Sequence, residues 1–172
     1  MGTLFYRCDE SLFYRCLSEP KPVTEDTRRI YVDADACPFK DDIIEIAAVN
    51  GWAVTMVATY NHEIEAPQPV EVVRVDCDRE AVDIMIANRA TARDIVVTQD
   101  YGLAALVLGK GARALSPRGR IFDVAEIGSL LDARHHAQKT RRSGGRLKGP
   151  PPLRRSDREQ FRRALEGLVK DR

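Results

Sequence analysis

Short apolar runs alternate along this chain with stretches in which apolar residues recur at helical spacing. The runs are rich in β-branched residues, and we expect strands at residues 30–32, 53–58, 70–75, 95–98 and 112–115. We expect helices over residues 38–50, 78–89, 100–108 and 124–135, and a last one from residue 156. This alternation predicts an α/β fold of three layers, with helices on both faces of a mainly parallel sheet of about five strands.

The same pattern divides the chain into three parts. Residues 1–28 form an N-terminal extension of unknown role, in which Leu4–Cys8 recurs as Leu12–Cys16. Residues 29–138 contain the alternating units and form the expected α/β domain. Residues 139–172 open with a basic loop rich in glycine, proline and arginine, and they end in an amphipathic helix. This C-terminal helix is expected to pack on the domain or to extend it, with a capping box from its Ser and Glu at residues 156 and 159.

Charge is distributed unevenly, although the net charge is only +1. Residues 134–172 carry 13 Lys and Arg against 4 Asp and Glu, whereas residues 1–133 carry 14 against 22. An acidic body with a basic end favours a polyanionic partner and divalent metal held by the acids, and a solvated basic tail is the alternative. No apolar run approaches the ~20 residues that cross a bilayer, so we expect a cytoplasmic protein without membrane contact. The four cysteines form no Cys-x-x-Cys pair, which favours reduced thiols.

Acidic residues follow two of the strand-like runs. Asp33 ends the first run, Asp35 lies in the next turn, and Asp100 follows the fourth run. Ligands of parallel sheets bind at the carboxyl ends of strands, so these acids meet if the first and fourth strands are neighbours. Asp83 lies about one turn into the helix predicted to follow Asp78. Carboxylate oxygens favour Mg²⁺ or Mn²⁺ over Zn²⁺, and such an ion can polarise a phosphate and activate water.

Several of these residues also have a purely structural interpretation. Asp100 has the position of a helix N-cap, and a single helical Asp such as Asp83 usually faces solvent. Asp33 and Asp35 resist this interpretation, because Asp is depleted in strands. Cys37 is a weaker candidate for a nucleophile, at the predicted helix cap.

These residues resemble the signature of the YaiI/YqxD family of bacterial proteins. The resemblance covers about residues 29–170 and leaves the N-terminal extension outside. It rests on Val32–Pro38, Asp78 with Ala81–Asp83, Val97–Asp100, Leu103 and Ala104, Ser116–Gly119, Gly149–Pro151, and Ser156–Arg158.

The resemblance implies a PIN-like fold, which is that of small α/β nucleases holding Mg²⁺ or Mn²⁺ with acids at strand ends. By that pattern Asp33, Asp83 and Asp100 match metal-binding catalytic acids. Asp35 matches the second early Asp of the family, and Thr98 matches the threonine of its Thr-x-Asp motif. The chain departs from the pattern at Ser116, where Asn is expected, and at Gln99, where a small residue is usual. Neither departure removes a metal ligand.

The leading hypothesis is therefore a metal-dependent phosphodiesterase that acts on RNA through Asp33, Asp35, Asp83 and Asp100. Its phosphate-binding residues are expected to be Thr98, Arg118, Arg141, Arg142 and Arg146. A second hypothesis is a non-catalytic RNA- or ribosome-binding module that keeps the acids. A third is a phosphatase of the haloacid-dehalogenase type, with Asp33 as nucleophile and Asp35 as acid and base, but the later Lys motif and paired-acid loop of that class are not apparent. The sequence leaves the substrate, the metal and homo-oligomerisation open.

Overall fold

A five-stranded sheet forms the centre of the computed structural model, which describes residues 27–60, 66–67, 69–76, 80–130 and 151–171. Every strand pair is parallel, and the strand order is β3-β2-β1-β4-β5. The strands are β1 (Arg29–Asp33), β2 (Ala53–Thr59), β3 (Glu71–Val75), β4 (Ile95–Val97) and β5 (Arg113–Leu115). The predicted parallel sheet of about five strands is thus confirmed, and it is entirely parallel.

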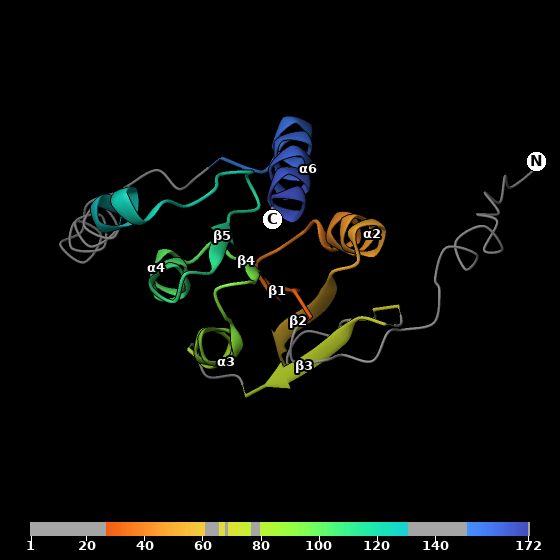
Figure 1. Cartoon of the computed structure of the whole chain (residues 1–172), viewed down its shortest axis with the longest axis horizontal. Helices are drawn as coiled ribbons and strands as arrows, with labels where there is room; N and C mark the ends of the chain where they lie inside the picture. Colours follow the sequence, from red (N-terminus) through yellow and green to blue (C-terminus); the bar gives the residue numbers. More distant parts are fainter. Residues whose placement is uncertain (1–26, 61–65, 68, 77–79, 131–150, 172) are drawn as a thin grey trace, which may run out of the picture.

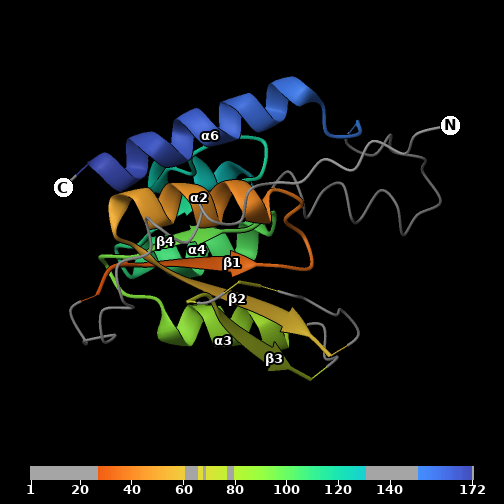
Figure 2. The ribbon, with the colours of Figure 1, turned by 90° about the vertical axis from the view of Figure 1, so that its right-hand side faces the viewer.

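Helices cover both faces of this sheet, as Figures 1 and 2 show. The helices are α2 (Lys40–Asn50), α3 (Ala81–Arg89), α4 (Tyr101–Gly109) and α6 (Arg155–Lys170), with a further helical stretch over residues 124–130. One core lies between the sheet, α2 and α6, and the other lies between the sheet, α3, α4 and the stretch over residues 124–130. The predicted three-layer α/β/α architecture is therefore confirmed.

Apolar side chains on both faces of β1 and β4 place these two strands in the middle of the sheet. Ile30 and Val32 are fully buried in the core under α2 and α6, while Tyr31 packs into the opposite core. All three residues of β4 are fully buried. Continuous burial of this kind is what a central parallel strand between two helical layers requires.

The order of the strands creates a switch point between β1 and β4. From β1 the chain steps to β2 and then β3, and it returns through α3 to place β4 on the other side of β1. Connections therefore leave the carboxyl ends of β1 and β4 in opposite directions, which is where open α/β sheets bind ligands. The condition set for the acids to meet, that the first and fourth strands are neighbours, is fulfilled.

Helix starts differ from the prediction at three places. α2 begins at Lys40, two residues after Pro38, because Phe39 packs its ring against Phe161 with ring centroids 5.6 Å apart. α3 begins at residue 81, and Asp78 lies outside the described residues. α6 begins one residue before the predicted Ser cap, because the backbone N–H of Arg154 donates to Asp157 Oδ2 at 2.7 Å. The helix predicted over residues 124–135 is described as far as residue 130.

The C-terminal helix packs on the domain and completes one of its two cores. Phe161 and Leu165 are fully buried there. Asp42 of α2, only 2% exposed, accepts a two-pronged hydrogen bond from Arg158 at 2.6 and 2.9 Å and a third from Arg162 at 2.6 Å. In the part of the chain that the structure describes, no helix has the length and apolarity to cross a membrane.

Candidate functional site

Asp33 and Thr98 face each other across the switch point. Asp33 is the last residue of β1 and is partly buried, and Thr98 directly follows β4 and is fully buried. The Thr98 hydroxyl donates to Asp33 Oδ2 at 3.3 Å and accepts the backbone N–H of Asp100 at 3.0 Å. A hydroxyl can donate its single proton while its oxygen accepts another hydrogen bond, so Thr98 contacts Asp33 and Asp100 at the same time. Thr98 therefore orients the Asp33 carboxylate from inside the protein.

The surroundings of Asp33 disfavour its negative charge. Burial raises the pKa of the Asp33 carboxyl, and the nearby charges of Asp35 and Asp100 raise this pKa further. The hydrogen bonds from Thr98 and from the backbone of Ala36 act in the opposite direction but do not cancel the rise. The carboxylates that follow β1 and β4 thus lie close enough to repel one another.

Asp100 caps the helix that follows β4. Its Oδ1 atom accepts the backbone N–H groups of Gly102 at 2.6 Å and Leu103 at 3.1 Å, so the predicted N-cap is confirmed. A Cβ atom at Gly102 would lie 2.9 Å from the same oxygen, which explains the glycine at this position. Capping fixes the Asp100 carboxylate at the sheet edge, so the structural and functional interpretations of this residue are compatible.

Three hydrogen bonds hold the turn that carries Asp35. Asp35 is exposed, and its Oδ2 atom accepts the backbone N–H of Thr59 at 3.1 Å and the Thr59 hydroxyl at 3.0 Å. Gln99 donates its side-chain N–H to the carbonyl of Ala36 at 2.6 Å. The turn is therefore tied to the ends of β2 and β4. Thr59 is not among the predicted site residues, and the only signal for it in the sequence is a hydroxyl residue at the end of an apolar strand.

Asp83 lies on α3, a different element from those that carry the other acids. It lies in the first turn of α3, is partly buried and sits beside Val82, which enters the core. Among the residues that the structure describes, no group of three or more His, Cys, Asp and Glu side chains is placed to hold a metal ion. Mg²⁺ usually binds one or two carboxylates and keeps several waters. The pair Asp33 and Asp100 therefore has enough carboxylates for such an ion, which does not need a closed set of protein ligands.

The structure describes two of the predicted phosphate-binding residues, Arg118 and Thr98, and both are engaged in contacts within the protein. Arg118 donates to Asp157 at 3.3 Å and to the carbonyl of Pro151, so it connects the turn after β5 to the start of α6. Thr98 is fully buried, and its hydroxyl is committed to Asp33 and Asp100. Arg141, Arg142 and Arg146 lie outside the described residues.

Cys37 has the environment of a structural thiol. Its side chain is 2% exposed in the core beneath α2. Burial raises the pKa of the Cys37 thiol to about 11, which keeps it protonated at neutral pH. Because the thiolate is the reactive form, these surroundings do not support a nucleophile.

Comparison with known proteins agrees with the motifs in this site. The model described as the uncharacterized YaiI/YqxD family (DUF188) matches residues 31–171. A UPF0178 protein of Halalkalibacterium halodurans is 46% identical over 143 residues, covering 83% of this chain and 91% of that protein. A UPF0178 protein of Staphylococcus haemolyticus is 39% identical over 144 residues, covering 83% and 97%.

A third relative, a UPF0178 protein of Alkaliphilus metalliredigens, is 42% identical over 141 residues, covering 82% of this chain and 91% of that protein. No solved structure gives a significant match. The matched segment runs from β1 to the end of α6, so it includes both the switch point and the C-terminal helix. The chain therefore belongs to the YaiI/YqxD family, also called UPF0178.

Proposed function

We propose that this chain is a PIN-like, metal-dependent phosphodiesterase that acts on RNA. The observation that carries the proposal is the arrangement at the switch point, where Asp33 and Asp100 lie at the ends of neighbouring strands. The charges of Asp35 and Asp100 help to raise the pKa of Asp33. Mutual repulsion between carboxylates is a cost to the fold that a bound cation removes. A buried carboxylate whose pKa is raised by acidic neighbours at a switch point is a candidate for function.

The donor set fits Mg²⁺ or Mn²⁺. Asp33 and Asp100 would hold the ion, with waters filling the remaining positions, and Asp35, whose charge acts on Asp33, would bind through such a water. When bound, the ion would polarise a phosphate oxygen and lower the pKa of an attacking water. Carboxylate oxygens without a nitrogen or sulfur donor favour these hard cations over zinc.

The residues around these acids would each have a separate role in the site. Thr98 fixes the rotamer of Asp33 through its hydroxyl hydrogen bond. Gln99 and Thr59 hold the turn that presents Asp35 toward solvent, where a carboxylate can accept a proton from water. The capping bonds from the start of α4 hold the Asp100 carboxylate in place.

A non-catalytic RNA-binding module is the second candidate, and one observation favours it. No three-carboxylate group is assembled among the described residues, whereas a two-metal nuclease would need more ligands. The phosphatase of the haloacid-dehalogenase type has less support, because the later Lys motif and the paired-acid loop of that class are not apparent in the sequence.

The test is cleavage of single-stranded RNA by the full chain with Mn²⁺ and with EDTA. We expect cleavage in Mn²⁺ only, and a loss of at least about 100-fold in Asp33→Asn, because removing a catalytic electrostatic group costs that much. Asp41→Asn is the matched control, since Asp41 is exposed in the first turn of α2, outside the switch point. Full activity of Asp33→Asn, or no cleavage by the wild type, would contradict the proposal.

A further inference from the structure

α6 runs antiparallel to the strands, so its first turns lie over the edge of the sheet that carries the acids. At this edge Arg158 binds Asp42, which belongs to the first turn of α2 just beyond β1. At the opposite edge Arg113, the first residue of β5, donates to the carbonyls of Leu168 at 2.6 Å and Asp171 at 3.3 Å. Figure 2 shows the same orientation, with the end of α6 marked C over the start of β1.

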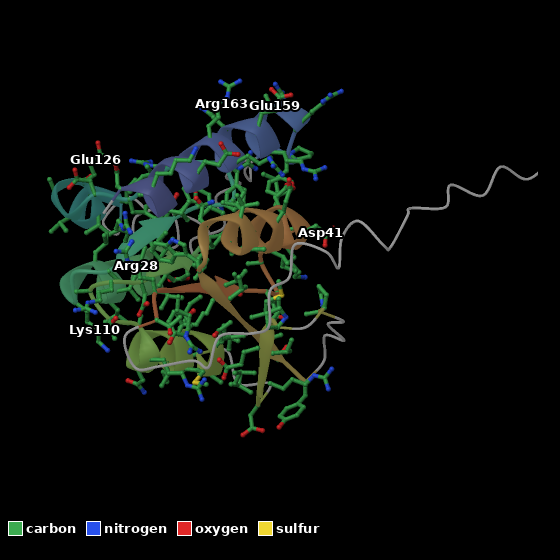
Figure 3. All side chains as sticks on the ribbon, turned by 45° about the vertical axis from the view of Figure 1, so that its right-hand side comes forward. Arg28, Asp41, Lys110, Glu126, Glu159 and Arg163 are labelled. Atoms are coloured by element: carbon green, nitrogen blue, oxygen red, sulfur yellow. The ribbon has the colours of Figure 1, made fainter. Side chains whose placement is uncertain are left out.

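The first turns of α6 carry an excess of exposed arginine. We call Arg154, Arg155, Arg158 and Arg163 the α6 arginine surface. One exposed acid, Glu159, lies among them, and Arg163 and Glu159 point outward from the helix in Figure 3. The Arg155 side chain is 93% exposed, and its contact with Glu159 spans 3.6 Å. Arg158 pairs with Asp42 and Arg155 lies near Glu159, so the four exposed arginines exceed the described carboxylates that contact them.

These arginines are placed where helix stability disfavours them. Arg154 is the N-cap of α6 and Arg155 its first residue, so both lie at the positive end of the helix dipole. The ion pair of Arg155 has its base before its acid, which is the weaker order along a helix. Arg158 gains compensation from the buried carboxylate of Asp42, whereas among the described residues Arg155 has only this exposed pair with Glu159. A local rule broken without a compensating gain indicates a functional residue.

We propose that the α6 arginine surface binds the phosphates of single-stranded RNA next to the acid edge of the sheet. The proposal rests on the proposed function for the identity of the polyanion. Arg154 and Arg155 supply planar donors without a buried ion pair, and Arg158 stays 54% exposed while it binds Asp42. The acids themselves repel phosphate, so a cationic surface beside them is needed to hold the strand.

The test uses the full chain in EDTA, with binding of a labelled oligouridine followed by fluorescence anisotropy at several salt concentrations. We expect Arg154→Ala/Arg155→Ala to bind roughly tenfold more weakly, with a salt slope lower by about 1.4, as for two lost contacts to single-stranded phosphates. The control Arg74→Ala/Lys170→Ala removes two exposed charges from β3 and the far end of α6, and it should bind like wild type. Thermal unfolding should show an unchanged or higher melting temperature for the test variant, because its arginines oppose the helix dipole.

The outcomes separate this proposal from the proposed function. An equal loss in both double variants, an unchanged salt slope, or no oligouridine binding by the wild type would overturn it. Binding that depends on α6 without any cleavage in Mn²⁺ would support this surface and reject the nuclease. Cleavage that is unaffected by Arg154→Ala/Arg155→Ala, with unchanged binding, would reject this surface alone.

Discussion

Asp33 ends β1 and has a carboxyl group whose pKa is raised by its surroundings. A terminal strand position with a buried carboxylate and two acidic neighbours keeps a proton more strongly than a free aspartate does. Between the ordinary pKa of aspartate and the raised pKa of Asp33, the folded protein therefore keeps a proton on Asp33 that the unfolded chain has released. As pH rises through the raised pKa of Asp33, the fold loses stability, and as pH falls toward the ordinary pKa of aspartate that stability returns.

We predict that Asp33→Asn stabilises the chain in EDTA at neutral pH. The amide keeps an oxygen for the Thr98 hydroxyl and removes the charge that Asp35 and Asp100 oppose. A gain of about 1 kcal/mol would raise the melting temperature by about 2–4 °C in a chain of this size. Asp41→Asn, the exposed control on α2, should lower the melting temperature slightly, because an acid in the first turn of a helix favours the helix dipole. A lower melting temperature for Asp33→Asn would contradict the account.

Thr98 is a residue that acts through its neighbours. We predict that Thr98→Val lowers the free energy of unfolding by about 1–3 kcal/mol, because the buried Asp100 N–H loses its acceptor and Asp33 its donor. Thr98→Ser keeps the hydroxyl and loses a methyl group, which costs about 0.8 kcal/mol. Urea unfolding of the two variants distinguishes these effects. A cost in Thr98→Ser with none in Thr98→Val would show that packing alone explains Thr98.

At the scale of elements, an ion pair fixes α6 to α2. Asp42 is nearly inaccessible, and its hydrogen bonds from Arg158, then those from Arg162, hold the pKa of its carboxyl below the usual range. The contribution of a group with a lowered folded pKa is present above its unfolded pKa and disappears as pH falls through the folded value. The pair therefore stabilises the docking of α6 at neutral pH and fails in acid.

We predict that Asp42→Asn destabilises the chain at neutral pH by about 2 kcal/mol, since a buried charge-assisted hydrogen-bond network is lost. The difference from wild type should begin to shrink below about pH 4, where the unfolded chain takes up the proton, and should disappear as pH falls through the lowered folded pKa of Asp42. Chemical unfolding at several pH values measures both. A difference that is independent of pH would show that the charge of Asp42 does not contribute.

The turn after β5 also meets α6 closely. Gly119 has a φ of +78°, and a Cβ atom there would lie 2.6 Å from the backbone carbon of Gln160. We predict that Gly119→Ala costs about 2 kcal/mol or more, from backbone strain together with displacement of α6. Gly51→Ala carries the strain alone, because its φ is +71° with no neighbour within 4 Å, and should cost about 1 kcal/mol. Equal losses in the two variants, by urea unfolding, would rule out the contact with α6.

At the scale of the whole molecule, the layers and the strand order follow from patterns that a sequence carries. The buried run from Ile30 to Val32 predicts a central strand, and a proline and helix after Asp35 predict a crossover. These signals are local, so the α/β architecture and the edge that carries Asp33 and Asp100 could be predicted. The N-cap role of Asp100 could be predicted for the same reason.

Contacts between distant residues could not be predicted in this way. Asp42 and Arg158 are separated by 116 positions, and nothing in either local pattern pairs them. The close approach of Gly119 to Gln160 depends on how α6 docks, and the commitment of the Thr98 hydroxyl depends on the register between β1 and β4. The sequence shows the excess of basic residues in the C-terminal part. It does not show that Arg158 and Arg162 form ion pairs with Asp42.

The central claim is that the acids at the switch point form a cation site, and calorimetric titration with Mn²⁺ tests it most directly. The wild-type chain should bind Mn²⁺, with affinity falling as pH falls through the raised pKa of Asp33. Asp33→Asn/Asp100→Asn should lose this binding while it stays folded, since Asn also caps helices well. No binding by the wild type, or equal binding by the double variant, would contradict the claim.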